Sequence, residues 1–179
     1  MNKKTKILES KIIFSGKWLN LKEDHIIKPD GIEARYEIVE RRDIVIVIAE
    51  ANGRIFMVSQ FRYAIDENSL EFPQGFIEKS ETPKNAAERE LEEETGYKPN
   101  SLISLGELWV SSGFLRQKAH VFTAVDLNLG TLNRDVTEAD MGIIELSFPE
   151  IEQKIINGEI KNGPTVAAFG LFVAHKKFS

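Results

Sequence analysis

Residues Ile44–Ala49 read Ile-Val-Ile-Val-Ile-Ala, a continuous apolar run with no polar side chain in it. A short run of this kind, rich in β-branched residues, is typical of a strand that is buried on both of its faces. The Asn52-Gly53 dipeptide that follows favours a tight hairpin, and we expect its returning strand at Ile55–Gln60. The run therefore predicts a sheet that is covered by other structure instead of lying open to water.

The rest of the chain mixes strand and helix signals. We expect further strands at Ser10–Phe14, Leu19–Ile27, Glu33–Val39, Ser101–Val110, His120–Val125 and Ile143–Phe148, and helices at Thr82–Thr95, Pro149–Asn157 and from Pro164 to about Lys177. Because the helices are too few to alternate with every strand, a mixed sheet covered by two or three helices is favoured over a doubly wound parallel sheet. The expected fold class is α/β, with residues 1–42 as a small β-rich segment and residues 43–179 as the main domain.

The helix expected at Thr82–Thr95 has clear start and stop signals. Thr82 can cap its N-terminus, Pro83 suits the first helical position, and Gly96 can close its C-terminus. For the helix expected from Pro164 to about Lys177, the apolar residues alone indicate which face packs against the core. We expect that face to consist of Val166, Ala167, Leu171 and Phe172.

The composition restricts the partners and the chemistry. With 23 basic and 28 acidic residues the chain carries a formal net charge of −5, which disfavours nonspecific binding to nucleic acid. The absence of Cys excludes disulfides, thiolate metal sites and a Cys nucleophile. Since no apolar run reaches the length of about 18 residues that a membrane span needs, and no signal peptide is recognisable, we expect a cytoplasmic protein without a membrane partner.

Three carboxylates share one face of the helix at Thr82–Thr95, because Glu90, Glu93 and Glu94 fall at positions i, i+3 and i+4. Two interpretations are open. A charge run is ordinarily a solvated face, but here like charges lie one turn apart, at a cost of about 0.2–0.5 kcal/mol per pair, and gather where the helix dipole disfavours them. A cation site explains both features. All-oxygen ligands, without Cys or a close His pair, favour Mg²⁺, with Mn²⁺ as the alternative, over Zn²⁺.

Arg89 projects away from the side of this helix that carries Glu90 and Glu94. We expect it to pair with a glutamate, either Glu81 or Glu93, and thereby to orient the metal-binding carboxylates.

The spacing of these residues resembles the signature of the Nudix hydrolases. The fixed positions of that signature are matched by Gly75, Glu81, Arg89, Glu90, Leu91, Glu93, Glu94 and Gly96. Only Tyr97 departs, since an aliphatic residue is usual there, and that position packs a core. The resemblance implies an α/β/α sandwich with a loop–helix–loop catalytic element, and hydrolysis of a nucleoside diphosphate linked to another moiety.

The same resemblance assigns roles in the site. Glu90 and Glu94 would be the main metal ligands, with Glu93 assisting and the main-chain carbonyl of Gln74 completing the set, while Glu93 and Arg89 belong to the catalytic group. Two or three Mg²⁺ ions held in this way would bridge the diphosphate, offset its charge and lower the pKa of the attacking water.

The flanking residues resemble the ADP-ribose and nucleotide-sugar pyrophosphatase branch of this family. Gln60-Phe61-Arg62-Tyr63 and Leu70-Glu71-Phe72-Pro73-Gln74-Gly75 carry that resemblance. It implies that Arg62 contacts the diphosphate, although a surface ion pair is the alternative, and that Glu71 helps to bind substrate or metal. Further along, Trp109–Phe114 resembles the Ser-Pro-Gly segment of the branch. Ser112, Gly113 and Gln117 are therefore expected to bind substrate. However, Ser112 stands where the branch usually has a proline, and Gln117 stands where it often has a glutamate. These two differences argue against strict ADP-ribose specificity.

Two further segments resemble elements of that branch. Residues 135–140, Asp-Val-Thr-Glu-Ala-Asp, are similar to an acidic loop that supplies the general base, for which Glu138 is the first candidate and Asp140 the second; an ordinary polar turn is the alternative. The N-terminal segment is similar to a dimerisation element in which each subunit helps to build its partner's site. There Trp18 and Arg41 or Arg42 would contact a nucleobase, unless Trp18 is a core or interface residue.

The expected protein is thus a homodimeric, Mg²⁺-dependent pyrophosphohydrolase. It would cleave nucleoside diphosphate sugars such as ADP-ribose, ADP-glucose and GDP-mannose to a nucleoside monophosphate and a sugar phosphate. One alternative is the same chemistry on dinucleoside polyphosphates, deoxynucleoside triphosphates or an RNA 5′ end, against which the surroundings of Arg62 and of Ser112-Gly113 argue. The other is a sensor that binds nucleotide sugars without cleaving them, which typically loses signature glutamates that this chain keeps.

Overall fold

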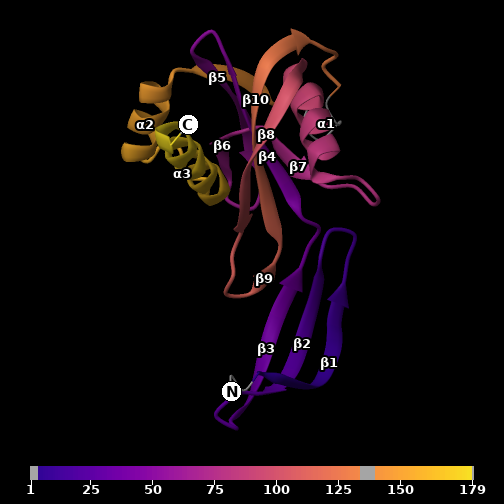
Figure 1. Ribbon diagram of the computed structural model, residues 1–179. Helices are drawn as coiled ribbons and strands as arrows, with labels where there is room; N and C mark the ends of the chain where they lie inside the picture. Colours follow the sequence, from indigo (N-terminus) through magenta and orange to yellow (C-terminus); the bar gives the residue numbers. More distant parts are fainter. Residues whose placement is uncertain (1–3, 134–139, 179) are drawn as a thin grey trace. The chain divides into compact units, whose positions relative to one another are not determined.

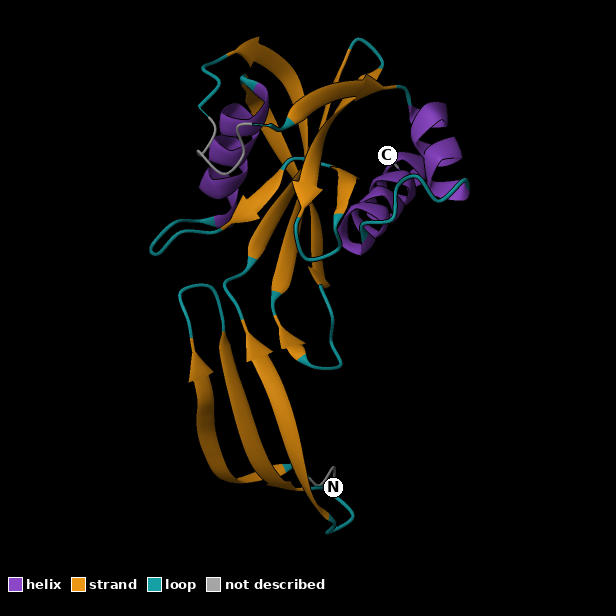
Figure 2. Ribbon diagram, turned by 180° about the vertical axis from the view of Figure 1, so that it is seen from behind, coloured by secondary structure: helices purple, strands orange, loops and turns teal. Residues whose placement is uncertain are grey.

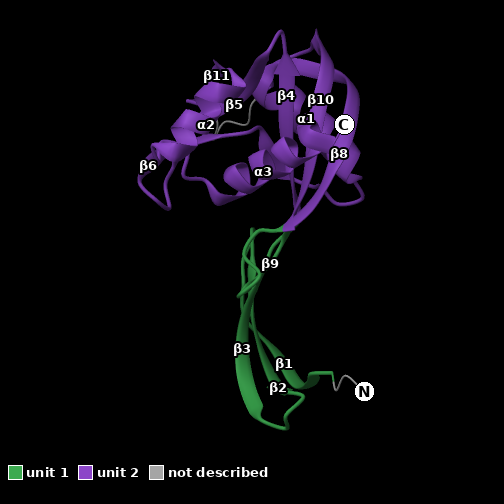
Figure 3. Cartoon of the chain, turned by 60° about the vertical axis from the view of Figure 1, so that its left-hand side comes forward, with its two compact units in different colours: residues 1–42, 109–118 green, residues 43–108, 119–179 purple. Residues whose placement is uncertain are grey.

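The computed structural model describes residues 4–133 and 140–178 (Figure 1). Strands account for most of the regular structure (Figure 2), and three helices are described, α1 (Pro83–Thr95), α2 (Phe148–Ile156) and α3 (Gly163–Phe178). Among the described residues no helix is both long and apolar enough to cross a membrane. The chain divides into two compact units (Figure 3): residues 1–42 with 109–118, and residues 43–108 with 119–179.

The first unit is built on one sheet with the strand order β1-β2-β3-β9. Its strands are β1 (Lys6–Ser15), β2 (Asn20–Ile27), β3 (Glu33–Glu40) and β9 (Leu115–Arg116). The first three are antiparallel neighbours, whereas β9 joins β3 in parallel. Residues Pro29, Asp30 and Gly31 lie in the turn between β2 and β3, and Gly31 adopts a φ of 90°, which glycine allows without strain.

The second unit contains a larger mixed sheet with the order β11-β5-β4-β10-β8, to which β6 is added beside β5 and β7 beside β4. The strands are β4 (Ile44–Ala51), β5 (Arg54–Arg62), β6 (Glu67–Glu71), β7 (Gln74–Phe76), β8 (Tyr97–Trp109), β10 (Lys118–Leu129) and β11 (Gly142–Leu146). β4 runs antiparallel to β5 and parallel to β10. The Asn52-Gly53 turn closes the β4–β5 hairpin with φ above 50° at both residues. The predicted α/β class with a mixed sheet is confirmed.

Helices cover both faces of this sheet (Figure 2): α1 lies on one side, and α2 with α3 on the other. Both α1 and α3 contact β4, the strand at the centre. Every side chain from Val45 to Ala49 is fully buried, as the apolar run predicted. The residues alternate between the two layers, so that Val45, Val47 and Ala49 pack in one cluster with Leu91 of α1.

Three details differ from the sequence-based expectation. The packing face of α3 consists of Thr165, Ala168, Phe169 and Phe172, while Ala167 is exposed. The helix is turned in this way because Phe169 and Phe172 contact the ring of Phe148, at centroid distances of 5.0 and 6.4 Å. Phe148 itself begins α2 instead of ending a strand, since Ser147 caps that helix in a box with Glu150. The short strands β6, β7 and β9 were not predicted, because none has a clear alternation of apolar and polar residues.

Candidate active site

Helix α1 begins and ends as its sequence signals predicted. The Thr82 hydroxyl accepts a hydrogen bond from the Asn85 main-chain N–H at 3.2 Å, and Pro83 occupies the first turn. At the other end Gly96 takes up the left-handed conformation with a φ of 75°, and its N–H donates to the Glu92 carbonyl at 2.8 Å. These ends fix the helical register and thereby the direction of each glutamate.

Two of the glutamates meet the main chain of β7. A Cβ atom at Gly75 would lie 2.1 Å from the carboxyl carbon of Glu90, so only glycine leaves room for that carboxylate. The Glu94 carboxylate, whose residue is 2% exposed, accepts a hydrogen bond from the Gln74 N–H at 3.2 Å. The backbone of Gln74 and Gly75 and the carboxylates of Glu90 and Glu94 therefore form one compact group.

Arg89 holds three carboxylates at once. Its guanidinium donates to both Glu81 oxygens at 3.0 and 2.9 Å, to Glu93 at 3.0 Å and to Glu90 at 2.8 Å. The contact with Glu90 differs from the expectation that Arg89 points away from that residue. The reason is a further bond of 3.0 Å to the carbonyl of Phe76, which draws the guanidinium towards β7, where Glu90 also lies.

The charges in this group reinforce one another. The hydrogen bonds to Glu81, together with attraction to Glu90, raise the pKa of Arg89 above its ordinary value. In return, the hydrogen bonds from Arg89 lower the pKa of Glu81. Arg89 therefore stays cationic and Glu81 anionic at neutral pH. Through these hydrogen bonds Arg89 fixes the directions of the glutamates around it.

A second charged group contacts the side chain of Gln74, whereas the first contacts its main chain. The Glu71 carboxylate is fully buried and accepts two hydrogen bonds from Arg62, one of them at 2.9 Å from Nε. It accepts a third from the side-chain amide of Gln74. A carboxylate can only accept, so the amide nitrogen must face Glu71, and the amide oxygen of Gln74 remains buried without a hydrogen-bond partner among the described residues.

The residues present suit a hard divalent cation. Carboxylate, main-chain carbonyl and amide oxygens are the ligands that Mg²⁺ prefers, and Gly75 leaves the space in which the Glu90 carboxylate meets the peptide backbone. As the side chains stand, no three acidic or His residues in the described part of the chain are arranged to hold a metal ion. Arg89 forms ion pairs with both Glu90 and Glu93.

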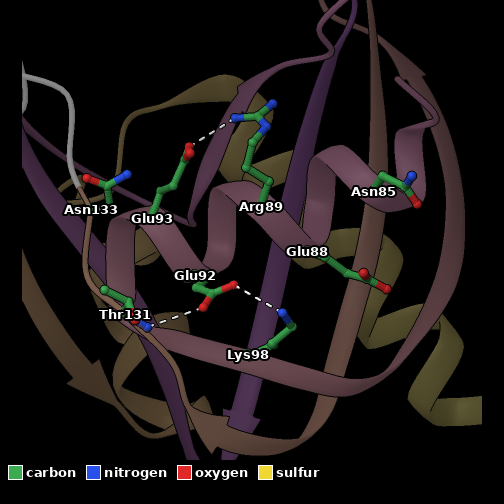
Figure 4. A pocket seen from close by; sticks show the side chains of 8 residues that line it. All are labelled: Asn85, Glu88, Arg89, Glu92, Glu93, Lys98, Thr131 and Asn133. Atoms are coloured by element: carbon green, nitrogen blue, oxygen red, sulfur yellow. Dashed lines mark hydrogen bonds and ion pairs between the residues drawn. The ribbon is translucent and has the colours of Figure 1, made fainter. Parts of the chain in front are cut away.

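A cavity of about 400 Å³ lies along α1 (Figure 4), and Arg89 and Glu93 of the carboxylate group form part of its wall. Here Glu92 accepts a hydrogen bond from the Thr131 N–H at 3.2 Å and pairs with Lys98 at 3.5 Å. The N–H of Asn133 donates to the Glu93 carbonyl at 3.2 Å. These contacts attach the segment that follows β10 to the last turn of α1.

The candidate base Glu138 lies outside the described residues, and Asp140 is exposed in a turn before β11.

The remaining candidates belong to the first unit. Trp18 is 52% exposed, and the guanidinium carbon of Arg42 lies 5.9 Å from the centre of its ring. Ser112 and Gly113 are exposed in the loop between β8 and β9, where they line a small cavity of about 270 Å³. Gln117 differs from these, because it is buried and donates its amide to the Arg42 carbonyl at 2.6 Å. Its side chain therefore supports the backbone next to Arg42.

Sequence reasoning did not anticipate a further cavity, which measures about 830 Å³. It lies in the second unit, between residues 62–71 and residues 158–162, and Arg62 and Glu71 form part of its wall. No local pattern indicates it, because its two walls come from segments far apart in the sequence.

Comparison with known proteins decides the family. A family model described as the NUDIX domain matches residues 39–167, and one described as the nucleoside diphosphate sugar hydrolase N-terminal domain matches residues 5–39. This chain belongs to the Nudix hydrolase family. The family predicted from the glutamate signature is thereby confirmed, and the second match places this Nudix hydrolase in the nucleoside diphosphate sugar branch.

Relatives of this Nudix hydrolase match along most of its length. An ADP-ribose pyrophosphatase of Bacillus subtilis (strain 168) is 33% identical over 165 residues, and a methanol dehydrogenase activator of Bacillus methanolicus is 34% identical over 165 residues. Each match covers 91% of this chain and 89% of the relative. A crystal structure described as that of an ADP compounds hydrolase shares the fold with a TM-score of 0.88, at 20% identity, over 97% of this chain and 95% of the other.

Proposed function

We propose that this Nudix hydrolase is a Mg²⁺-dependent pyrophosphohydrolase that cleaves the diphosphate of nucleoside diphosphate sugars, ADP-ribose included. The products are a nucleoside monophosphate and a sugar phosphate. One observation carries the proposal: the carboxylates of Glu90 and Glu94 converge on the backbone of Gln74 and Gly75. This arrangement offers several oxygen ligands to a hard cation in one place.

The roles of the residues follow from their positions. Glu90, Glu94 and the Gln74 carbonyl hold the metal, and Glu93 assists while Arg89 sets the directions of Glu90 and Glu93. Bound Mg²⁺ would offset the charge of the diphosphate and lower the pKa of the attacking water. Among the branch relatives, the Bacillus subtilis ADP-ribose pyrophosphatase supports the choice of substrate.

Further residues are proposed to contact the substrate. Arg62 binds the diphosphate, and its direction is fixed by the buried Glu71. Trp18 with Arg42 binds the nucleobase, because an exposed indole next to a guanidinium offers a surface for stacking. Ser112 and Gly113 are proposed to contact substrate from their exposed loop. Glu138 is the proposed general base, with Asp140 as the second candidate.

A panel of substrates tests this function. Hydrolysis of ADP-ribose, ADP-glucose, GDP-mannose, UDP-glucose, diadenosine polyphosphates and dGTP is followed by phosphate release, with added phosphatase and with or without Mg²⁺. We expect metal-dependent cleavage of several nucleotide sugars and little cleavage of the others. Activity confined to dGTP or to the dinucleotides would contradict the substrate class, and tight binding of nucleotide sugars without products would contradict catalysis.

We propose further that the protein is a homodimer that associates through its first unit. All ten residues of β1 are exposed, among them Ile12 at 60% and Phe14 at 56%. The described residues of this unit form a single sheet without a helix. A soluble chain rarely exposes so many large apolar side chains on one element unless a partner covers them. A second copy of the same chain is the partner that we propose.

Replacing Ile12 by Glu is expected to dissociate this dimer. The wild type should have twice the mass of the 20.3 kDa chain in light scattering, and the variant the mass of one chain. Lys11→Glu introduces the same carboxylate at the neighbouring exposed position and is the control, which is expected to stay dimeric. A wild type that is monomeric at micromolar concentration would refute the proposed dimer.

A further inference from the structure

We propose that Gln117 is a positioning residue for the nucleotide half of the substrate, and that it acts through Arg42 without touching the substrate itself. The inference rests on the proposed function, because Arg42 is there a contact of the nucleobase. A buried amide thereby sets the affinity of an exposed binding surface.

The side chains proposed to bind the nucleobase are exposed. Trp18 is 52% exposed, and Arg42 is exposed as well, with its guanidinium carbon 5.9 Å from the centre of the indole ring. The ammonium of Lys17, the neighbour of Trp18 in the chain, lies 4.5 Å from the same ring centre. Residues 41–43 belong to neither a helix nor a strand. Because an arginine side chain has many rotamers, the direction of Arg42 depends on how well its backbone is held.

Gln117 holds that backbone from a buried position. The residue is 3% exposed, and its amide nitrogen donates a hydrogen bond to the Arg42 carbonyl at 2.6 Å. A buried hydrogen bond is costly to leave unmade, so it fixes the position of this carbonyl. Next to it, the Arg41 N–H donates to the Arg116 carbonyl at 3.3 Å. Arg41 and Arg42 are therefore both attached, through main-chain atoms, to residues 116 and 117.

The main chain of Gln117 has a separate role, because it closes the loop that contains Ser112 and Gly113. Its carbonyl accepts a hydrogen bond from the Val110 N–H at 3.1 Å, at the start of that loop. Gln117, Arg42 and the loop all belong to the first unit. A substitution of the Gln117 side chain removes the link to Arg42 and leaves the main-chain link to the loop in place.

An amide suits this role, whereas a carboxylate does not. A Gln side chain carries two N–H donors, but an ionised Glu side chain can only accept. A carboxylate at position 117 would meet the Arg42 carbonyl without a hydrogen between the two oxygens, and burial of its charge would add a further cost. The departure from the glutamate that is frequent in this branch is therefore what allows residue 117 to hold Arg42.

Gln117→Met removes the amide at nearly constant volume and tests this role. We expect the KM for ADP-ribose to rise at least about fivefold, the effect of one lost hydrogen bond, with kcat within about twofold of the wild type. The Kd for AMP, measured by titration calorimetry, should rise by the same factor. In an Arg42→Ala background Gln117→Met should change neither constant, because the effects of two residues that act through one another do not add.

Gln117→Glu separates positioning from direct contact. A residue that bound the substrate itself would tolerate the glutamate that is frequent in this branch, whereas the positioning role predicts a KM at least as high as that of Gln117→Met. Thr123→Val is the matched control. It removes another buried hydrogen bond from a side chain to a main-chain carbonyl, that of Ile48 at 3.1 Å, in the second unit. We expect its KM to equal that of the wild type, and melting temperatures show how much stability each variant has lost.

The fluorescence of Trp18 reports the position of Arg42 without any substrate. The chain has two Trp residues, so Trp109→Phe leaves Trp18 as the only indole. In that background Gln117→Met should shift the emission of Trp18 as Arg42→Ala does. Unchanged emission in Gln117→Met, or additive effects of Gln117→Met and Arg42→Ala on KM, would overturn the inference. Failure of the proposed function looks different, because the wild type would then cleave no nucleotide sugar although the shift in emission remained.

Discussion

Replacing Glu94 by Gln is expected to lower kcat about 10³-fold at saturating Mg²⁺, because one negative ligand is removed from the metal group. The fold should persist. The Glu94 side chain is buried, and the amide oxygen of a Gln at this position can still accept the hydrogen bond from the Gln74 N–H. The measurement is kcat for ADP-ribose together with Mn²⁺ affinity and the melting temperature.

Glu92→Gln is the matched control for this variant. The same chemical change occurs two residues away on the same helix, but Glu92 lies on the outer face, against Thr131 and Lys98. We expect its kcat to stay within a few-fold of the wild type. Near-normal turnover of the Glu94→Gln variant would show that Glu94 is not a metal ligand of the active site.

Replacing Gly75 by Ala is expected to lower kcat about 10²-fold with little change in the melting temperature. The added Cβ would lie 2.1 Å from the Glu90 carboxyl carbon, so one of them must move. The carboxylate is the end of a flexible side chain and can turn away at small cost in stability. The same movement displaces a metal ligand by about 1 Å or more, and a misplacement of that size can cost about 10² in rate.

Gly170→Ala in α3 separates this effect from a general effect of adding a methyl group. A Cβ at Gly170 meets no atom within 4 Å, so activity should be that of the wild type. Metal affinity should fall in Gly75→Ala alone. A Gly75→Ala variant with normal kcat and normal metal affinity would refute the close approach of Glu90 to β7.

The elements that could be predicted from the sequence have local causes. Thr82, Pro83 and Gly96 define α1 through hydrogen bonds and backbone angles within a few residues, so their pattern is visible in the sequence. The burial of Val45–Ala49 could likewise be predicted from these residues alone, because all of them are apolar. The signature glutamates follow from α1, because a helix of known register brings residues three and four apart to one face.

The features that could not be predicted depend on contacts between distant segments. The packing face of α3 is set by Phe148, which lies about 20 residues before the aromatic rings it meets and belongs to another helix. Arg89 reaches Glu90 because the Phe76 carbonyl of a neighbouring strand binds its guanidinium. The cavity beside Arg62 has walls from opposite halves of the main domain. In each case the contact that determines the arrangement joins residues that are distant in the sequence.

The most direct test of the account is the identity of the products from ADP-ribose, resolved by chromatography with Mg²⁺ and with excess chelator. The account predicts AMP and ribose 5-phosphate in equal amounts with Mg²⁺ and neither product with chelator. Formation of ADP and free ribose, or cleavage that persists when the metal is removed, would contradict metal-dependent hydrolysis of the diphosphate.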